Sequence, residues 1–185
     1  MKIKTISLLL VIVMAASLLA SCSAGTTTTT STTTSTTDVV ASASIVDNAA
    51  GFENAISKDG TWIICTTKDL SIDKDLVLEG DFKNGKKDAD GNELLQRKIG
   101  LYTQDADRNI AARFTLTAKS LTIKSALASI EHGTFKGDLY IDVKDFQLVD
   151  ATIDGNVYFQ SEEIKTSFTM DDKSKVTGTQ EVKAN

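Results

Sequence analysis

The stretch Leu121–Lys124 reads LTIK, and its pattern returns as LYID in Leu139–Asp142 and as VYFQ in Val157–Gln160. The interval from Leu121 to Leu139 equals the interval from Leu139 to Val157, and each copy alternates apolar residues with polar or aromatic ones. Such alternation is the period of a β-strand, whose successive side chains point to opposite faces. A fixed spacing between similar strands indicates a repeated structural unit.

Other positions share this spacing, so the repeat involves more than one strand per unit. Farther along the chain the spacing is longer, as the intervals from Leu148 to Met170 and from Ile153 to Val176 show. The added residues predict a longer loop around Ser161–Glu163. The further pairs that share the original spacing are Ala128 and Phe146, Ile130 and Leu148, Phe135 and Ile153, Gly137 and Gly155, and Asp138 and Asn156.

Weaker copies upstream bring the number of repeats to about five. Leu101 precedes Leu121 at a slightly longer spacing, and Leu70–Leu78 holds an earlier apolar alternation. A repeat of this length predicts an all-β fold, a short parallel β-helix or β-solenoid whose turns stack about 4.8 Å apart around one apolar interior. The glycines at 137, 155 and 178 are expected at a corner of each turn, and the absence of proline fits strands that donate hydrogen bonds on both sides.

An antiparallel β-sandwich is the alternative fold, because its strands also recur every 8–12 residues. The shared register of several positions favours the solenoid over hairpins. Before the strands, Asp47–Ile56 predicts a short helix with Asp47 as its N-cap and with Phe52 and Ile56 on one side. This helix is expected to cover the open N-terminal end of the solenoid.

The repeat and the preceding helix resemble the single-stranded right-handed β-helix proteins, which include pectate-lyase-like enzymes and bactofilin-type polymer-forming proteins. The resemblance covers Phe52 to Val182 and is one of period and element order. No catalytic motif of those enzymes accompanies it. The resemblance implies a right-handed parallel β-helix and leaves the function open.

The N-terminus has the order of an export signal. Lys2 and Lys4 precede the apolar stretch Ile6–Met14, and small residues follow it up to Cys22. The apolar stretch is shorter than the roughly 20 residues that a membrane span needs. Leu19–Cys22 reads LASC and resembles the bacterial lipobox, which implies cleavage before Cys22 and acylation of its thiol by palmitate-type chains. We therefore expect a lipoprotein signal peptide at 1–21 and a lipid anchor on the extracytoplasmic face of a cell membrane.

A linker and one domain follow the anchor. Every residue of Thr26–Thr37 is Thr or Ser, which leaves no apolar surface to bury, so 22–38 is interpreted as a tether. Residues 39–185 are long enough for one domain with a core. The formal net charge is −5 and becomes more negative when the two lysines of 1–21 are removed, which argues against nucleic acid as a partner.

Tyr140 and Tyr158 occupy equivalent outward positions of two successive repeats. Two neighbouring phenol rings suit stacking on a cell-wall glycan or packing against an envelope protein, and they equally suit cross-strand pairing that stabilises the sheet. Cys65 follows Trp62–Ile64 and is interpreted as a small apolar residue of a buried strand. His132 has no second histidine near it in sequence and is assigned to a corner.

Two acidic stretches are similar in sequence. Asp88 and Asp90 lie in DADGN, and Asp105 and Asp107 lie farther along the chain in DADRN. If these loops lie on adjacent turns, their oxygens offer ligands of the kind that Ca²⁺ prefers, although neither stretch matches an EF-hand loop. The same residues are also ordinary turn formers.

These features predict a non-enzymatic, membrane-tethered binding or structural module of the cell envelope. Its partners are expected to be the membrane, through lipid on Cys22, and a wall glycan, an envelope protein or further copies of the chain. The alternative from another class is a small polysaccharide-acting, pectate-lyase-like enzyme that uses Asp105, Asp107 and Arg108. That alternative is disfavoured because few turns and short loops leave little chain to build a cleft.

Overall fold

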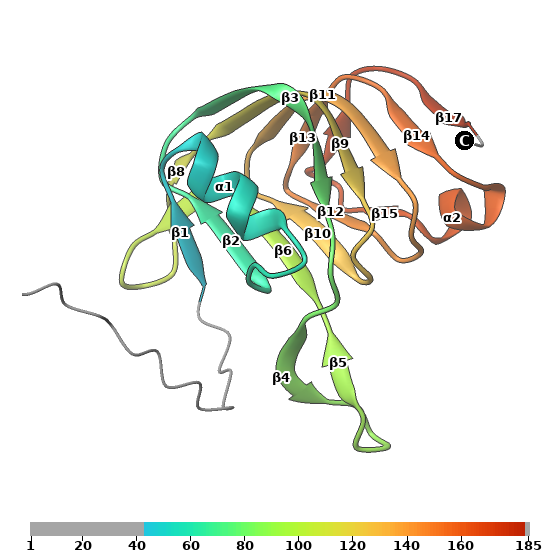
Figure 1. The fold of residues 1–185 in the computed structure, drawn as a ribbon, viewed down its shortest axis with the longest axis horizontal. Coiled ribbons are helices and arrows are strands. Elements are labelled where there is room, and N and C mark those ends of the chain that lie inside the picture. The colour runs from blue at the N-terminus through green and yellow to red at the C-terminus, as the bar shows by residue number, and fades with distance from the viewer. Residues whose placement is uncertain (1–42, 184–185) are drawn as a thin grey trace, which may run out of the picture. The chain divides into compact units, whose positions relative to one another are not determined.

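Two parallel β-sheets hold most strands of the fold in the computed structural model, which describes residues 43–183 (Figure 1). The predicted signal peptide, Cys22 and the linker 22–38 lie outside the described residues. In the first sheet the order is β1 (Ser44–Val46), β2 (Ile63–Thr66), β6 (Arg97–Gly100), β10 (Ala128–Glu131), β12 (Gln147–Val149) and β15 (Thr169–Met170).

The second sheet begins with β3 (Leu70–Leu78), β9 (Thr115–Ile123) and β11 (Thr134–Ile141). Beyond β11 the strands are shorter and lie in two series, and from β2 onward the chain passes alternately between the two sheets. One series continues with β13 (Thr152–Asp154) and β16 (Lys175–Val176), and the other with β14 (Val157–Phe159) and β17 (Gln180–Val182).

Every strand pair within these two sheets is parallel, which confirms the predicted all-β class with parallel sheets. The alternative of an antiparallel sandwich is wrong. Antiparallel pairing among the described residues is confined to two hairpins. One joins β4 (Lys83–Lys87) to β5 (Glu93–Leu95), and the other joins β7 (Tyr102–Gln104) to β8 (Ile110–Arg113).

The spacing of the repeat is the register of the sheets. Leu139 pairs with Leu121 on one side and with Val157 on the other, and Ile130 pairs with Leu148. Upstream the predicted match of Leu101 to Leu121 is wrong, because Leu76 is the residue that pairs with Leu121. Both hairpins lie between β3 and β9 in the sequence. The added residues lengthen the interval from Leu76 to Leu121, so the repeat is not visible there as a short period.

Apolar side chains of both sheets form one buried cluster. Alternate residues of each strand enter it, and the residues between them face outward. The first sheet contributes Ile64, Ile99, Ile130 and Leu148, and the second contributes Leu76, Leu121, Leu139 and Val157.

Glycine recurs where β11 bends and where the later strands break. Gly155 lies between β13 and β14, and a Cβ on it would lie 2.1 Å from the carbonyl oxygen of Gly137. Gly178 follows β16, and a Cβ there would lie 2.5 Å from the carbonyl oxygen of Gly155. The three backbones approach too closely for any side chain, which explains why this position of the repeat is glycine.

Helix α1 (Ala49–Ile56) confirms the predicted helix but not its cap. The side chain of Asn48, not that of Asp47, accepts the hydrogen bond from the N–H of Gly51, at 2.8 Å. Phe52 and Ile56 are buried in the core. A second helix, α2 (Glu162–Ser167), occupies the predicted loop, with Ser161 as N-cap and Ile164 buried.

Arg97 has a charged side chain that is fully buried, and this side chain connects the end of α1 to the end of β3. Its guanidinium donates to the carbonyl oxygens of Glu79 at 2.6 Å, Ala55 at 2.8 Å and Ser57 at 2.9 Å, and it stacks 3.9 Å from the centre of the Phe82 ring. Burial lowers the pKa of Arg97 to about 10, which leaves it charged at neutral pH. One cation therefore satisfies carbonyl groups at the end of α1 and of β3.

No helix within residues 43–183 is both long enough and apolar enough to cross a bilayer.

Candidate functional site

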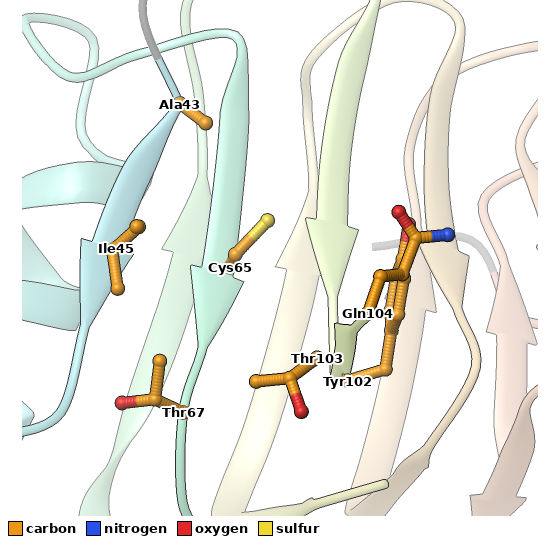
Figure 2. A pocket seen from close by; sticks show the side chains of 7 residues that line it. All are labelled: Ala43, Ile45, Cys65, Thr67, Tyr102, Thr103 and Gln104. Carbon is orange, nitrogen blue, oxygen red and sulfur yellow. The ribbon is translucent and has the colours of Figure 1, made fainter. Parts of the chain in front are cut away.

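A groove of about 270 Å³ lies on the outer face of the first sheet. Strands β1 and β2 form one side of it and β7 forms the other (Figure 2). On β1 and β2, the side chains of Val46, Ile64 and Thr66 point into the core. The side chains that line the groove alternate with them along the strands and point outward. The residues that line the groove are Ala43, Ile45, Cys65, Thr67, Tyr102, Thr103 and Gln104.

Ile45 makes this surface apolar. Its side chain is 74% exposed, the highest value among the large hydrophobic residues described as exposed. The neighbouring wall consists of the Cys65 thiol and the ring of Tyr102, with Gln104 at the rim (Figure 2). The groove therefore presents apolar surface with a few neutral hydrogen-bonding groups, which is the composition of a binding site.

Cys65 lies in a strand as predicted, but its side chain is not in the core. It is half-buried and lines the groove, whereas Ile64 before it enters the core. The continuous apolar run Trp62–Cys65 gave no alternation from which to assign the face. Burial raises the pKa of the thiol, so Cys65 stays protonated at neutral pH.

Tyr102 lies close to the backbone of the first sheet because residue 100 is glycine. A Cβ on Gly100 would lie 3.0 Å from the Tyr102 ring and 3.4 Å from the sulfur of Cys65. Burial, with the nearby charge of Glu131, raises the pKa of the Tyr102 phenol. The phenol is therefore neutral and forms part of the groove wall.

Three residues, His132, Asp150 and Arg113, hold the Tyr102 ring in place. The ring meets the imidazole of His132 edge-on, with centroids 4.5 Å apart and planes at 77°. Nδ1 of His132 lies 3.1 Å from Oδ2 of Asp150, and the same oxygen accepts from Arg113 at 2.5 Å. Arg113 is the cross-strand neighbour of Tyr102 in the hairpin, so the four residues form a closed circuit.

The turn between β10 and β11 places His132 in this circuit, in agreement with its predicted corner position. Its φ is 61°, and Asp150 also lies in the left-handed region with φ of 50°. The Arg113 hydrogen bond, and to a lesser degree His132, lower the pKa of the Asp150 carboxyl. Asp150 therefore carries a negative charge at neutral pH.

Glu131 is the buried carboxylate beside the groove. It is the register partner of Gly100, and its Oε1 accepts from Lys98 Nζ at 2.9 Å and from the Ser129 hydroxyl at 3.0 Å. Its charge is therefore balanced by neighbours on the same sheet. The two carboxylates nearest the groove, Glu131 and Asp150, are thus each paired with a neighbouring basic side chain.

Asp105 forms the turn of the β7–β8 hairpin. Its carboxylate accepts from the N–H groups of Asp107 and Asn109, both at 2.9 Å. Hydrogen bonds from Asn109 lower the pKa of Asp105. In the β4–β5 hairpin, Asp88 accepts from the N–H groups of Asp90 and Asn92 in the same way, at 2.9 and 2.8 Å, and its pKa is likewise lowered.

The four aspartates of the calcium hypothesis are therefore not on adjacent turns. Asp88 and Asp90 lie in the β4–β5 hairpin, which extends to the bottom of Figure 1, whereas the hairpin with Asp105 and Asp107 lies on the side of β8. Within residues 43–183 no group of three or more His, Cys, Asp or Glu side chains is arranged to hold a metal ion. The similarity of the two stretches reflects the same aspartate-built turn used twice.

Tyr140 and Tyr158 are brought together as the sequence predicts. They are register partners on β11 and β14, with ring centroids 5.0 Å apart and planes at 31°. The ammonium of Lys183, which follows β17 on the other side of β14, lies 4.8 Å from the Tyr158 centroid. The ring of Tyr158 is thus engaged on both sides, which favours a role in stabilising the sheet.

Comparison of the chain with protein-family models, with curated proteins and with solved structures found no match.

Proposed function

We propose that this chain is a cell-envelope lipoprotein, anchored to the membrane through Cys22, whose domain is a non-catalytic β-solenoid that binds a partner in the groove of the first sheet. The lipobox-like sequence before Cys22 and the Thr/Ser tether support the anchor. The exposed Ile45 beside an apolar groove is the observation that carries the binding role. Exposed apolar surface of this kind marks interaction sites on proteins.

The solenoid is supported by the strand order. The chain alternates between two parallel sheets, and each strand pairs with the equivalent strand of the next repeat. Helix α1 buries Phe52 and Ile56 at the N-terminal end of this arrangement. A right-handed coil is the hand that parallel crossovers favour.

The chemistry at the groove supports binding over catalysis. The Cys65 thiol is kept protonated by burial, so it is a poor nucleophile. Glu131 is engaged by Lys98, and Asp150 is engaged by Arg113 and His132. A general acid or base must be free to reach a substrate, and these carboxylates already have partners.

A thermal-shift screen of the protein against isolated wall glycans and envelope peptides tests the binding role. A ligand that binds only the folded state raises the melting temperature. We expect at least one ligand whose shift disappears in Thr67→Trp, which fills the groove, and persists in the matched variant Tyr140→Ala on the second sheet. Shifts that persist in Thr67→Trp and disappear in Tyr140→Ala would place binding on the tyrosine pair instead.

A further inference from the structure

Strand β1 is an open edge of the first sheet. It pairs with β2 on one side, and no strand within residues 43–183 pairs with its other side (Figure 1). The N–H of Thr67 donates to the carbonyl of Val46, so the backbone groups of Val46 point toward β2. Because successive residues of a strand direct their backbone groups to opposite sides, the N–H and C=O of Ile45 point off the edge.

The edge strands of the second sheet carry charges, and β1 does not. β3, at the N-terminal edge of the second sheet, contains Asp73, Lys74 and Asp75. At the C-terminal end, β16 contains Lys175 and β17 contains Glu181. Charged residues on an edge strand oppose pairing with another chain.

The sequence of β1 is Ser-Ile-Val, and no charged residue lies between Asp38 and Asp47. Its central side chain, Ile45, is the exposed apolar residue beside the groove. Edge, exposed side chain and groove therefore form one continuous uncharged surface. An open hydrophobic edge of this kind is a site for strand addition.

We propose that β1 is a dimerisation edge, on which β1 of a second copy pairs in antiparallel orientation around a two-fold axis at Ile45. The two Ile45 residues then exchange both of their free backbone hydrogen bonds, and their side chains meet on the outer face beside the two grooves. Each copy contributes the same uncharged strand, β1, to the interface, so dimerisation requires no second binding surface. This inference goes beyond the proposed ligand binding, because the second copy pairs with the β1 edge and not within the groove.

The alternative in which copies stack head to tail is disfavoured by the ends of the sheets. Head-to-tail stacking would bring β15, β16 and β17 of one copy against β1 and β3 of the next. The edges other than β1 are charged or, for β15, only two residues long. A heterologous contact of that kind would also continue into filaments, whereas the two-fold contact closes as a dimer.

Cysteine crosslinking of the full chain tests the register of this pairing. In a background of Cys22→Ser and Cys65→Ser, Ile45→Cys places two thiols on a hydrogen-bonded antiparallel pair with Cα atoms about 5.5 Å apart, which a disulfide spans. Ser44→Cys is the matched control, because residue 44 faces residue 46 of the partner. We expect Ile45→Cys to crosslink as a dimer under mild oxidation at least tenfold more than Ser44→Cys. Equal crosslinking of the two variants would overturn the proposal.

Sedimentation of the full chain supplies a second readout. We expect a dimer whose dissociation constant rises at least tenfold in Ile45→Lys, a substitution at a 74% exposed side chain. Identical sedimentation of wild type and Ile45→Lys, or species that grow beyond the dimer with concentration, would overturn it. The groove-filling Thr67→Trp leaves the β1 edge free, so loss of dimerisation and loss of ligand binding are distinguishable.

Discussion

The ring of Tyr102 stands edge-on against the imidazole of His132, with centroids 4.5 Å apart. This contact joins the β7–β8 hairpin to the corner between β10 and β11, and it closes a circuit that passes through Asp150 and Arg113. The groove exists because this circuit fixes the hairpin across the outer face of the first sheet. The free energy of unfolding of the protein should therefore change when the residues that hold the Tyr102 ring are substituted.

Gly100→Ala should lower the free energy of unfolding by about 1–2 kcal/mol, as overpacking of a well-packed site does. The added methyl would lie 3.0 Å from the Tyr102 ring, which His132 prevents from moving away. Urea unfolding measures the change. In a Tyr102→Ala background the same substitution should have almost no effect, and an equal loss in both backgrounds would contradict the account.

Asp150→Asn should destabilise the protein by about 1 kcal/mol at pH 7. Arg113 holds the pKa of Asp150 below its ordinary value in the folded state. A carboxyl with a lowered pKa contributes stability above its unfolded pKa of about 3.9 and loses that contribution as the pH falls through the folded value. The difference in melting temperature between wild type and variant should therefore close below about pH 4. A difference that stays constant down to pH 2 would show that charge is not the cause.

Arg97→Met should lower the free energy of unfolding by about 3 kcal/mol, because it leaves buried carbonyl groups without donors. These are the carbonyls of Ala55 and Glu79, to which the guanidinium now donates. Lys136→Met is the control, since Lys136 makes an exposed ion pair with Asp154 and should change stability by less than about 1 kcal/mol. Chemical denaturation of both variants gives the comparison, and equal losses would refute the role assigned to Arg97.

Tyr140→Ala and Tyr158→Ala should each destabilise the protein, and the double variant should lose less than the sum. The rings contact each other at 5.0 Å, and aromatic pairs contribute about 0.5–1.5 kcal/mol beyond their buried area. A double-mutant cycle measured by thermal unfolding gives the coupling directly. Additive losses together with lost glycan binding would assign the pair to a ligand site.

Much of the fold was predictable from residues 121–182, where Leu121, Leu139 and Val157 repeat at one spacing and pair in one register. Upstream, Leu76 pairs with Leu121 across a much longer stretch of chain, because two hairpins interrupt the repeat and disguise the period. Helix α2 was missed although Ser161 and the two glutamates after it form a helix start signal. Its position in a lengthened repeat favoured a loop.

The groove was not predictable in the same way. Cys65 follows Ile63 and Ile64, and an uninterrupted apolar run does not tell which residue faces outward. The contacts of Tyr102 with His132 and of Arg113 with Asp150 join residues that are far apart in the chain. Only the stacking of the strands brings them together. The aspartate loops show the converse, since their similar sequences reflect similar turns and not spatial proximity.

Fatty-acid labelling of the full chain produced in a bacterial host tests the proposed anchor most directly. The chain has two cysteines, so Cys65→Ser is a matched control for Cys22→Ser. We predict that wild type and Cys65→Ser incorporate labelled palmitate and partition with membranes, and that Cys22→Ser does neither. Label that is absent from wild type, or that persists in Cys22→Ser, would contradict the proposed anchor.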